Sequence, residues 1–140
     1  MIKKILLLIV ITFYFSGCSK KEEKFELFSA ESFAYSMEDG WELNAVVRSK
    51  GFEQKEIDNK FSVKLSYYIN IETPEGKLLE KITSGVLDKT SDENISEIPI
   101  ELQIKLDSTY KTGNYKIIFY VADELASRRT VSWSYFELSK

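Results

Sequence analysis

The chain of 140 residues contains a single cysteine, Cys18, and no histidine. A cysteine can act as a nucleophile, bind a metal, form a disulfide or pack as a buried thiol. Without histidine, a Cys-His or Ser-His nucleophile pair is excluded, and the commonest general base near neutral pH is missing. One cysteine also excludes an internal disulfide and a thiolate metal site. The role of Cys18 therefore has to be inferred from the residues around it.

Residues 1–17 have the three parts of a cleaved targeting segment. The start "MIKK" is basic, Ile5 to Phe15 form an apolar run whose only polar side chain is Thr12, and Ser16 and Gly17 are small. As a helix the run would span about 16 Å, against a hydrocarbon core of about 30 Å. It is too short to cross a bilayer and predicts a secretory signal peptide. The alternative is a buried cysteine in an uncleaved hydrophobic N-terminal helix.

The segment "FSGC" at residues 15–18 resembles the lipobox of bacterial lipoproteins, in which a pair of small residues precedes the cysteine. It departs from that pattern at Phe15, where Leu is usual. The resemblance implies cleavage just before Cys18 and attachment of a diacylglycerol to its thiol. It also implies a location in the bacterial cell envelope, with membrane lipid as the first partner of the chain. More than one acyl chain gives durable attachment.

Residues 18–24 are expected to form the lipidated cysteine and a charged tether, because "SKKEEK" contains nothing that could pack. In enterobacterial lipoproteins, a residue other than Asp directly after the cysteine favours the outer membrane. That residue is Ser19 in this chain, so we expect outer-membrane anchoring. Lys21 to Glu23 resemble the Lys-acid-acid tag that directs some Bacteroidetes lipoproteins to the cell surface. The alternative is a solvated linker without sorting meaning, and the choice between the periplasmic and surface sides stays open.

Composition limits the activities and partners of the chain. Its formal charge is −3, and without residues 1–17 it has 17 basic and 22 acidic residues, which argues against nucleic acid as a partner. Two acid-rich loops, residues 51–60 and 88–97, contain oxygen ligands for Ca²⁺ but lack the pattern of a dedicated site. We interpret both as solvated connections, and Arg128 and Arg129 as flanking a turn, with an anion site as the alternative. We expect no metal, no cofactor and no enzymatic activity.

Residues 25–140 alternate apolar and polar side chains with a period of two, as β-strands do, and show no sustained helical stripe. "TPEGK" at residues 73–77 is typical of a turn, with a Pro followed by a Gly. Short strands separated by polar turns predict an all-β sandwich or barrel of about seven strands. The expected strands begin within residues 25–35 and continue at 41–48, 61–72, 77–87, 98–106, 114–123 and 129–138.

The order and spacing of these strands are similar to those of immunoglobulin-like and fibronectin-like modules. The similarity centres on "LDSTYKTGNYKIIFYV" at residues 106–121, where Tyr115 opens the penultimate strand at the position of the family's tyrosine corner. The resemblance implies an immunoglobulin-like β-sandwich over residues 25–140. It also implies that strands 41–48 and 98–106 share one sheet, and that strands 61–72, 115–122 and 130–138 share the other.

The alternation also assigns side chains to faces of the sheets. Five aromatic residues are expected in the core, namely Trp41, Phe61, Tyr67, Phe119 and Trp133. In the last strand, Val131 and Tyr135 share the face of Trp133, and a bulge near Tyr135 is needed to bring Leu138 back into phase. The outer face of the second sheet is then a candidate binding face, unless a loop or the N-terminal segment covers it, and it comprises Tyr68, Ile118, Tyr120 and Phe136.

These observations lead to two hypotheses about function. The first is a non-enzymatic envelope lipoprotein whose sandwich binds a protein partner or helps to assemble an envelope structure. The second is a carbohydrate-binding module in which Tyr68 and Tyr120 form a stacking platform for a glycan. A sugar platform needs coplanar exposed rings with polar neighbours, whereas a protein interface needs Ile118 and Phe136 exposed beside the tyrosines.

Overall fold

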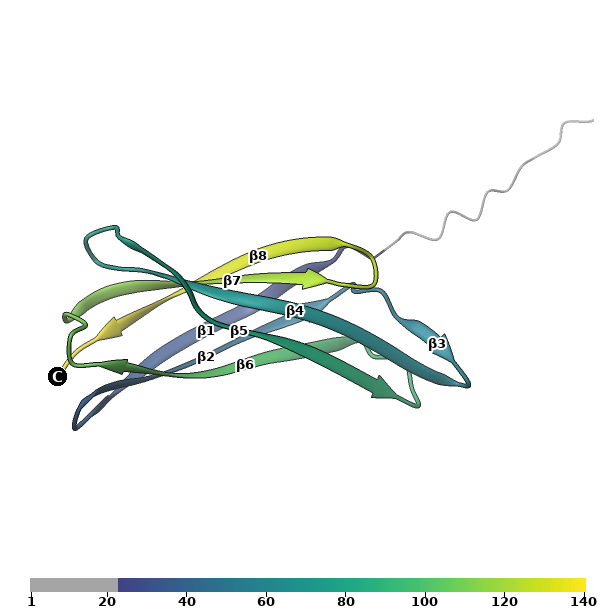
Figure 1. The fold of residues 1–140 in the computed structure, drawn as a ribbon, viewed down its shortest axis with the longest axis horizontal. Coiled ribbons are helices and arrows are strands. Elements are labelled where there is room, and N and C mark those ends of the chain that lie inside the picture. Colours follow the sequence, from purple (N-terminus) through teal and green to yellow (C-terminus); the bar gives the residue numbers. More distant parts are fainter. Residues whose placement is uncertain (1–22) are drawn as a thin grey trace, which may run out of the picture.

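Residues 23–140 form a two-layered β-sandwich (Figure 1). The structure is a computed structural model that describes those residues, so the expected signal peptide, Cys18 and tether positions 19–22 lie outside the described part. In that part no helix is long and apolar enough to cross a membrane. Its eight strands are β1 (Glu26–Met37), β2 (Gly40–Lys50), β3 (Lys55–Ile57), β4 (Lys60–Glu72), β5 (Leu78–Ser91), β6 (Glu97–Asp107), β7 (Gly113–Asp123) and β8 (Arg128–Leu138).

The strands pair in two antiparallel sheets. One has the order β1-β2-β6; in the other, β4 pairs with both β5 and β7, β7 pairs with β8, and the short β3 pairs with the start of β4. If the short β3 is left out, the first, second and fifth strands (β1, β2 and β6) form one sheet and the other four form the second. This is the partition of an immunoglobulin-like sandwich. The all-β sandwich prediction is confirmed, with eight strands in residues 23–140 instead of about seven.

Alternating side chains fill the space between the sheets. Every second residue of β2 is buried from Trp41 to Val47, and the inward positions of β6 and β7 follow the predicted phase. Phe119 of β7 is fully buried, whereas Phe61 and Tyr67 of β4 are partly buried. The period-two pattern is therefore a reliable guide wherever only one face of a strand is apolar.

Two local features match their predictions. The hydroxyl of Tyr115 donates a hydrogen bond to the carbonyl of Lys111 at 2.6 Å, which is the tyrosine-corner contact. Burial, together with the nearby carboxylate of Glu75, raises the pKa of Tyr115 above its usual value. The expected turn at residues 73–77 is closed by the Thr73 amide, which donates to the Lys77 carbonyl at 2.8 Å, and Gly76 adopts a φ of +83°.

Strand β8 has the opposite phase from the prediction. Phe136 and Leu138 lie in the core with 4% and 1% of their surface exposed, whereas Val131, Trp133 and Tyr135 are exposed. The strand pairs with β7 in one unbroken register over its whole length, without the expected bulge near Tyr135. Placing Trp133 in the core was therefore wrong, and so was placing Phe136 on the outer face.

The seam between β1 and β8 explains this phase. These edge strands of the two sheets lie side by side (Figure 1). The Ser32 hydroxyl donates to the Ser134 hydroxyl at 2.9 Å, so Ser134 points into the seam. A serine side chain fits between two edge strands at this distance, whereas an indole at the same position would push them apart. The tryptophan of β8 therefore faces outward, and Phe136 completes the core beside Tyr115, with ring centroids 5.3 Å apart.

A buried ion pair holds the end of the sandwich where the described chain begins. The carboxylate of Asp123, fully buried, accepts hydrogen bonds from the Glu53 amide at 2.7 Å and from Arg128 at 3.2 Å. Arg128 also donates to the Gly51 carbonyl at 2.7 Å. Gly51 has a φ of +75°, and a Cβ there would lie 2.1 Å from the Lys24 carbonyl oxygen, so the close approach requires glycine. Arg128 flanks the β7–β8 turn, as expected.

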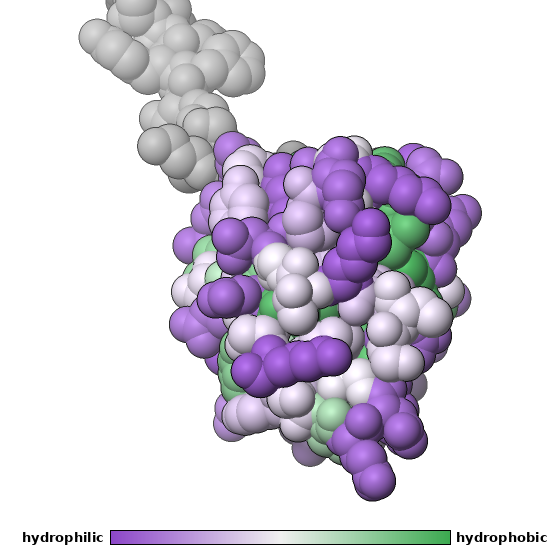
Figure 2. All heavy atoms as spheres, turned by 90° about the vertical axis from the view of Figure 1, so that its left-hand side faces the viewer, coloured by the Kyte–Doolittle hydropathy of each residue, from purple (hydrophilic) through white to green (hydrophobic). Residues whose placement is uncertain are grey.

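The two acid-rich segments are partly strand. Lys55–Ile57 forms β3 inside the first segment, and β5 extends through Ser91 into the second. Within residues 23–140, no group of three or more Asp, Glu or Cys side chains is placed to hold a metal ion. The opposite end of the sandwich, where the β1–β2 and β4–β5 turns lie, is shown in Figure 2. Hydrophilic residues cover most of that end, and strongly apolar ones appear there in small separate areas.

Candidate functional site

The outer face of the five-stranded sheet carries aromatic side chains in adjacent cross-strand rows. The rows run over β4, β7 and β8, and neighbours in a row are close enough to interact. They are Tyr68–Tyr120–Val131, Asn70–Ile118–Trp133 and Glu72–Lys116–Tyr135. We define the aromatic face as the surface formed by Tyr68, Ile118, Tyr120, Val131, Trp133 and Tyr135.

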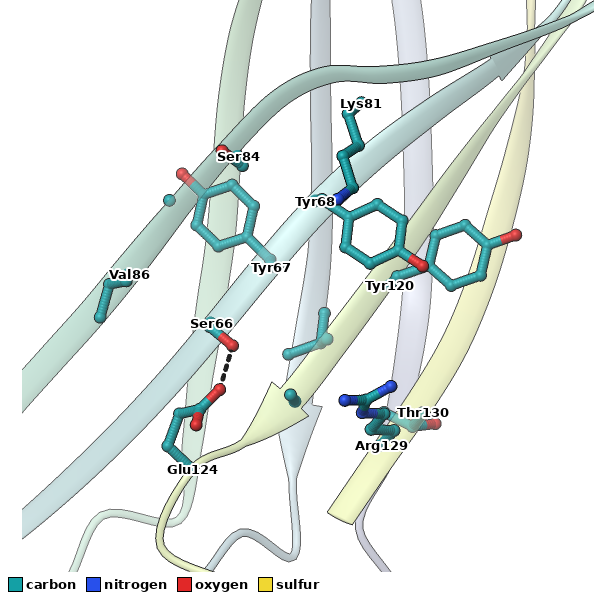
Figure 3. A pocket seen from close by; sticks show the side chains of 13 residues that line it. Ser66, Tyr67, Tyr68, Lys81, Ser84, Val86, Tyr120, Glu124, Arg129 and Thr130 are labelled. Carbon is teal, nitrogen blue, oxygen red and sulfur yellow. Dashed lines mark hydrogen bonds between the residues drawn. The ribbon is translucent and has the colours of Figure 1, made fainter. Parts of the chain in front are cut away.

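Two tyrosines form the centre of this face. The rings of Tyr68 and Tyr120 stack with centroids 4.6 Å apart and an interplanar angle of 8°. The ammonium of Lys81 lies over the Tyr68 ring, 5.5 Å from its centroid. Lys81 comes from β5 and Tyr120 from β7, the two strands that flank β4 on opposite sides, so the Tyr68 ring has a neighbour from each adjacent strand (Figure 3).

The position of Lys81 follows from a break in the β4–β5 ladder. The register shifts between Ile69 and Ile71, and Lys81 adopts a φ of +49° there. The side chain of Asn70, only 5% exposed, accepts a hydrogen bond from the Lys81 amide at 2.9 Å. This contact satisfies a backbone donor that the irregular ladder would leave unpaired. Asn70 thereby fixes the segment that carries the lysine.

Strand β8 supplies the most exposed members of the face. Trp133 is 51% exposed and Tyr135 is 67% exposed. The ammonium of Lys116 lies 4.9 Å from the Trp133 ring and 6.0 Å from the Tyr135 ring. Such cation–π contacts hold the lysine and the rings in a defined arrangement. Each of the three rows of the face therefore contains a ring beside a lysine.

The four candidate residues from the sequence have different positions. Tyr68 and Tyr120 are half-buried on the aromatic face, stacked on each other. Ile118 is on this face but is only 9% exposed, between Asn70 and Trp133. Phe136 is in the core, so it does not belong to the face, and neither of the two exposures expected of a protein interface, those of Ile118 and Phe136, is present. The place of Phe136 is taken by Trp133 and Tyr135.

Sequence reasoning missed these two residues for an identifiable reason. Both sets of alternate positions in β8 contain large apolar residues, so periodicity alone does not choose between them. The signal that favours the observed phase is that Ser132, Ser134, Phe136 and Leu138 continue one alternation to the end of the strand without a bulge. Phe33 and Tyr35 on β1, about half-exposed and in edge-to-face contact at 4.9 Å, were also missed.

A shallow hollow of about 620 Å³ lies beside the tyrosine stack (Figure 3). Tyr68 and Tyr120 line it together with Lys81 and, from the start of β8, Arg129. Ser66 and Glu124 also line it, and the Ser66 hydroxyl donates a hydrogen bond to Glu124. The hollow therefore combines aromatic walls with cationic, carboxylate and hydroxyl groups, which suits a ligand group that has both apolar and polar atoms.

The three cations of the face, Lys81, Lys116 and Arg129, form no ion pair within 4.0 Å in residues 23–140. The same holds for exposed lysines elsewhere on the described molecule, such as Lys55, Lys89 and Lys105. The opposite outer surface is polar and internally paired, since Gln103 donates to Glu42 at 2.7 Å. The chemistry that the aromatic face offers is binding through rings and unpaired cations.

Neither a protein-family model nor any curated protein matches this chain.

Proposed function

We propose that this protein is a lipid-anchored component of a bacterial cell envelope, and that its sandwich binds a protein partner through the aromatic face. The role is non-enzymatic: the domain holds or helps to assemble another envelope protein. The lipid anchor at Cys18 is inferred from the lipobox-like "FSGC" at residues 15–18. The outer membrane is the proposed location.

The observation that carries the binding proposal is the exposure of Trp133 and Tyr135 beside the Tyr68–Tyr120 stack. Tryptophan and tyrosine dominate the energetics of protein interfaces because they bury a large area with little conformational entropy. Trp133 and Tyr135 are 51% and 67% exposed, so no segment of residues 23–140 covers them. Exposed apolar area of this kind often marks a binding surface.

The ring geometry favours a protein partner over a glycan. A sugar platform needs ring faces that lie in one plane and are open to solvent, whereas the Tyr68 and Tyr120 rings stack on each other and the Lys81 ammonium lies over the Tyr68 ring. The predicted tyrosine platform is therefore not presented as separate flat surfaces. Side chains of a protein partner can instead contact ring edges, the Trp133 indole and the hollow together.

The anchor is tested by metabolic labelling with a palmitate analogue. The wild-type chain should incorporate the label, whereas Cys18→Ala should not. A matched Ser19→Ala variant should be labelled like the wild type, because it leaves the cysteine in place. Equal labelling of wild type and Cys18→Ala would exclude the proposed lipid attachment.

The binding face is tested by site-specific photocrosslinking in intact cells. A photoreactive phenylalanine analogue replaces Tyr135 on the aromatic face or, as the control, Glu101 on the opposite sheet. Both side chains are exposed, so neither replacement disturbs the core. We expect a discrete adduct with a different protein from position 135 and none from position 101. No such adduct at position 135, or the same adduct at both, contradicts the proposal.

A further inference from the structure

We infer that two copies of this chain associate edge to edge through β6, so that their three-stranded sheets join into one six-stranded antiparallel sheet. The inference goes beyond the proposed function, because it concerns the sheet opposite the aromatic face and a second copy of the chain itself. It follows from the unpaired edge of β6, from the direction of its backbone groups and from the side chains along it.

Strand β6 is an open edge of the sandwich. On the far side of its sheet, the edge strand β1 lies against β8 in the seam described above. By contrast, β6 pairs with β2 on one side, and no strand of residues 23–140 pairs with its other side. An edge of 11 residues with free N–H and C=O groups is a template on which another strand can pair.

The core is incompletely covered at this edge. Ile100 and Leu106 of β6 are buried, whereas Leu102 and Ile104, the inward-facing residues between them, are only partly buried. A strand added beside β6 would bring its own inward-facing side chains against these two residues. The centre of β6 is therefore the part of this edge that gains most apolar burial from a neighbouring strand.

A side-chain hydrogen bond shows which backbone groups of β6 point toward the open edge. The Ile98 carbonyl accepts a hydrogen bond from the Ser49 hydroxyl of β2 at 2.8 Å, so it points toward β2. Backbone direction alternates along a strand, so the odd-numbered residues of β6 point the other way. Pro99 fits this phase, because a proline without an N–H is suited to the free side of an edge strand. The free N–H and C=O groups at the centre of the edge belong to Glu101, Gln103 and Lys105.

This edge is complementary to itself. In a symmetric pair of strands, the residue opposite each position is fixed by the two-fold axis, and opposed side chains lie on the same face of the sheet. With the axis beside Gln103, Glu101 of each copy lies opposite Lys105 of the other. On the inner face, Leu102 of each copy lies opposite Ile104 of the other. Backbone groups, opposite charges and apolar side chains therefore match in one register.

The other open edge, β5, lacks this complementarity. It spans Leu78–Ser91 and pairs with β4 alone in the described part of the chain. Of its two symmetric registers about the middle of the strand, one places Lys81 opposite Lys89 and the other places Glu80 opposite Asp88. Like charges directly opposite each other destabilise a strand pair. Self-association is therefore assigned to β6.

The dimer leaves the aromatic face of each copy free, because that face belongs to the other sheet. The two β6 strands run antiparallel, so the end that carries Glu23 in one copy is far from the same end of the other. If both copies are anchored as proposed, their strands lie along the membrane.

The charge register is tested by light scattering of the full chain in detergent over a dilution series. Glu101→Lys or Lys105→Glu alone places like charges opposite each other, so we expect the dimer dissociation constant to rise at least tenfold. The two substitutions together place opposite charges face to face again and should restore it to within threefold of the wild type. Circular dichroism verifies that each variant folds.

The matched controls are Glu80→Lys and Lys89→Glu, which make the same charge changes at exposed positions of β5. Both should dimerise like the wild type. A wild type that is monomeric at every concentration, a double variant as weak as the single ones, or equal losses in the β5 controls would overturn the inference.

The position of the axis is tested in intact cells with the photoreactive phenylalanine analogue at Gln103 or, as the control, at Ser84 of β5. Both side chains are exposed. We expect an adduct of two copies from position 103 and none from position 84, and equal yields contradict the dimer. Neither test involves the partner of the aromatic face, so the proposed function and the dimer can fail separately.

Discussion

At the scale of single residues, two buried polar groups organise the ends of the sandwich. The Tyr115 hydroxyl secures the β6–β7 connection through the Lys111 carbonyl, and Asp123 secures the β7–β8 turn through Arg128. Tyr115 could be recognised from the sequence because its contact is local and follows a turn glycine. The contacts of Asp123 and Arg128 could not be recognised, because the Glu53 amide that binds Asp123 and the Gly51 carbonyl that binds Arg128 are distant in sequence.

Replacing Tyr115 by Phe should lower the free energy of unfolding by about 1 to 2 kcal/mol, because it leaves the Lys111 carbonyl without its partner. Urea denaturation measures this. Tyr135→Phe is the matched control, since Tyr135 is 67% exposed, and it should change stability by less than about 0.5 kcal/mol. Equal losses for the two variants would contradict the tyrosine-corner role.

The same hydroxyl predicts a pH dependence. Burial raises the pKa of Tyr115 in the folded state, so the unfolded chain loses this proton first as pH rises. The stabilisation is fully present below about pH 10, the ordinary value for tyrosine, and is lost as pH rises through the folded-state pKa. Urea titrations from pH 9 to 11 should therefore show a steeper fall for the wild type than for Tyr115→Phe. Parallel curves would contradict this linkage.

Replacing Asp123 by Asn should destabilise the fold by about 3 kcal/mol, because Arg128 would keep its partly buried charge without a counter-ion. Asp92→Asn is the control, since Asp92 forms an exposed pair with Lys60 at 4.0 Å and should cost less than about 1 kcal/mol. Thermal or urea unfolding of both variants measures the difference. Similar small losses would show that the buried pair contributes little.

At the scale of elements, the phase of β8 decides which residues form the aromatic face. Strands β2 and β6 could be predicted from the sequence, because the polar and apolar positions of each are largely segregated, whereas β7 has apolar residues on both faces. In β8 the residues Trp133 and Phe136 lie on opposite faces and are both large, so the sequence pattern is ambiguous. The contact of β1 with β8, through Ser32 and Ser134, resolves it. That contact is tertiary and has no local signal.

The phase of β8 can be tested by truncating one aromatic residue from each face. Phe136→Ala should cost about 3 to 5 kcal/mol, because Phe136 is 4% exposed and its removal leaves a cavity beside Tyr115. Trp133→Ala should cost less than about 1 kcal/mol, because the indole is half-exposed. Urea denaturation compares the two. A larger loss for Trp133→Ala would mean that the strand has the phase first expected.

At the scale of the whole molecule, one end of the sandwich adjoins the segment that leads to its proposed anchor. The Glu23 carbonyl accepts a hydrogen bond from Arg128 at 3.4 Å, at the end where β8 begins. Residues 18–24 can span at most about 25 Å when extended, so that end would lie near the membrane. The aromatic face then extends from this end along β8 and is accessible from the side of the domain.

The sequence predicts the architecture and the sheet that carries the candidate site. It predicts only half of the residues that form the aromatic face. Tyr68 and Tyr120 follow from alternation alone. The contact of Lys81 with Tyr68 depends on a ladder irregularity held by Asn70, which periodicity does not indicate. The partner also cannot be read from this chain, because its identity depends on complementarity rather than on a motif.

The central claim is that a protein partner covers the aromatic face in the envelope. Hydroxyl-radical footprinting tests it most directly, by comparing intact cells with the same protein extracted in detergent and separated from its partners. Modification of Trp133 and Tyr135 should be at least fivefold slower in cells, whereas Met37 and Ile57, about as exposed as Trp133 but outside the face, should react at nearly the same rate in both samples. Equal rates for Trp133 in the two samples, with Met37 and Ile57 unchanged, would contradict the account.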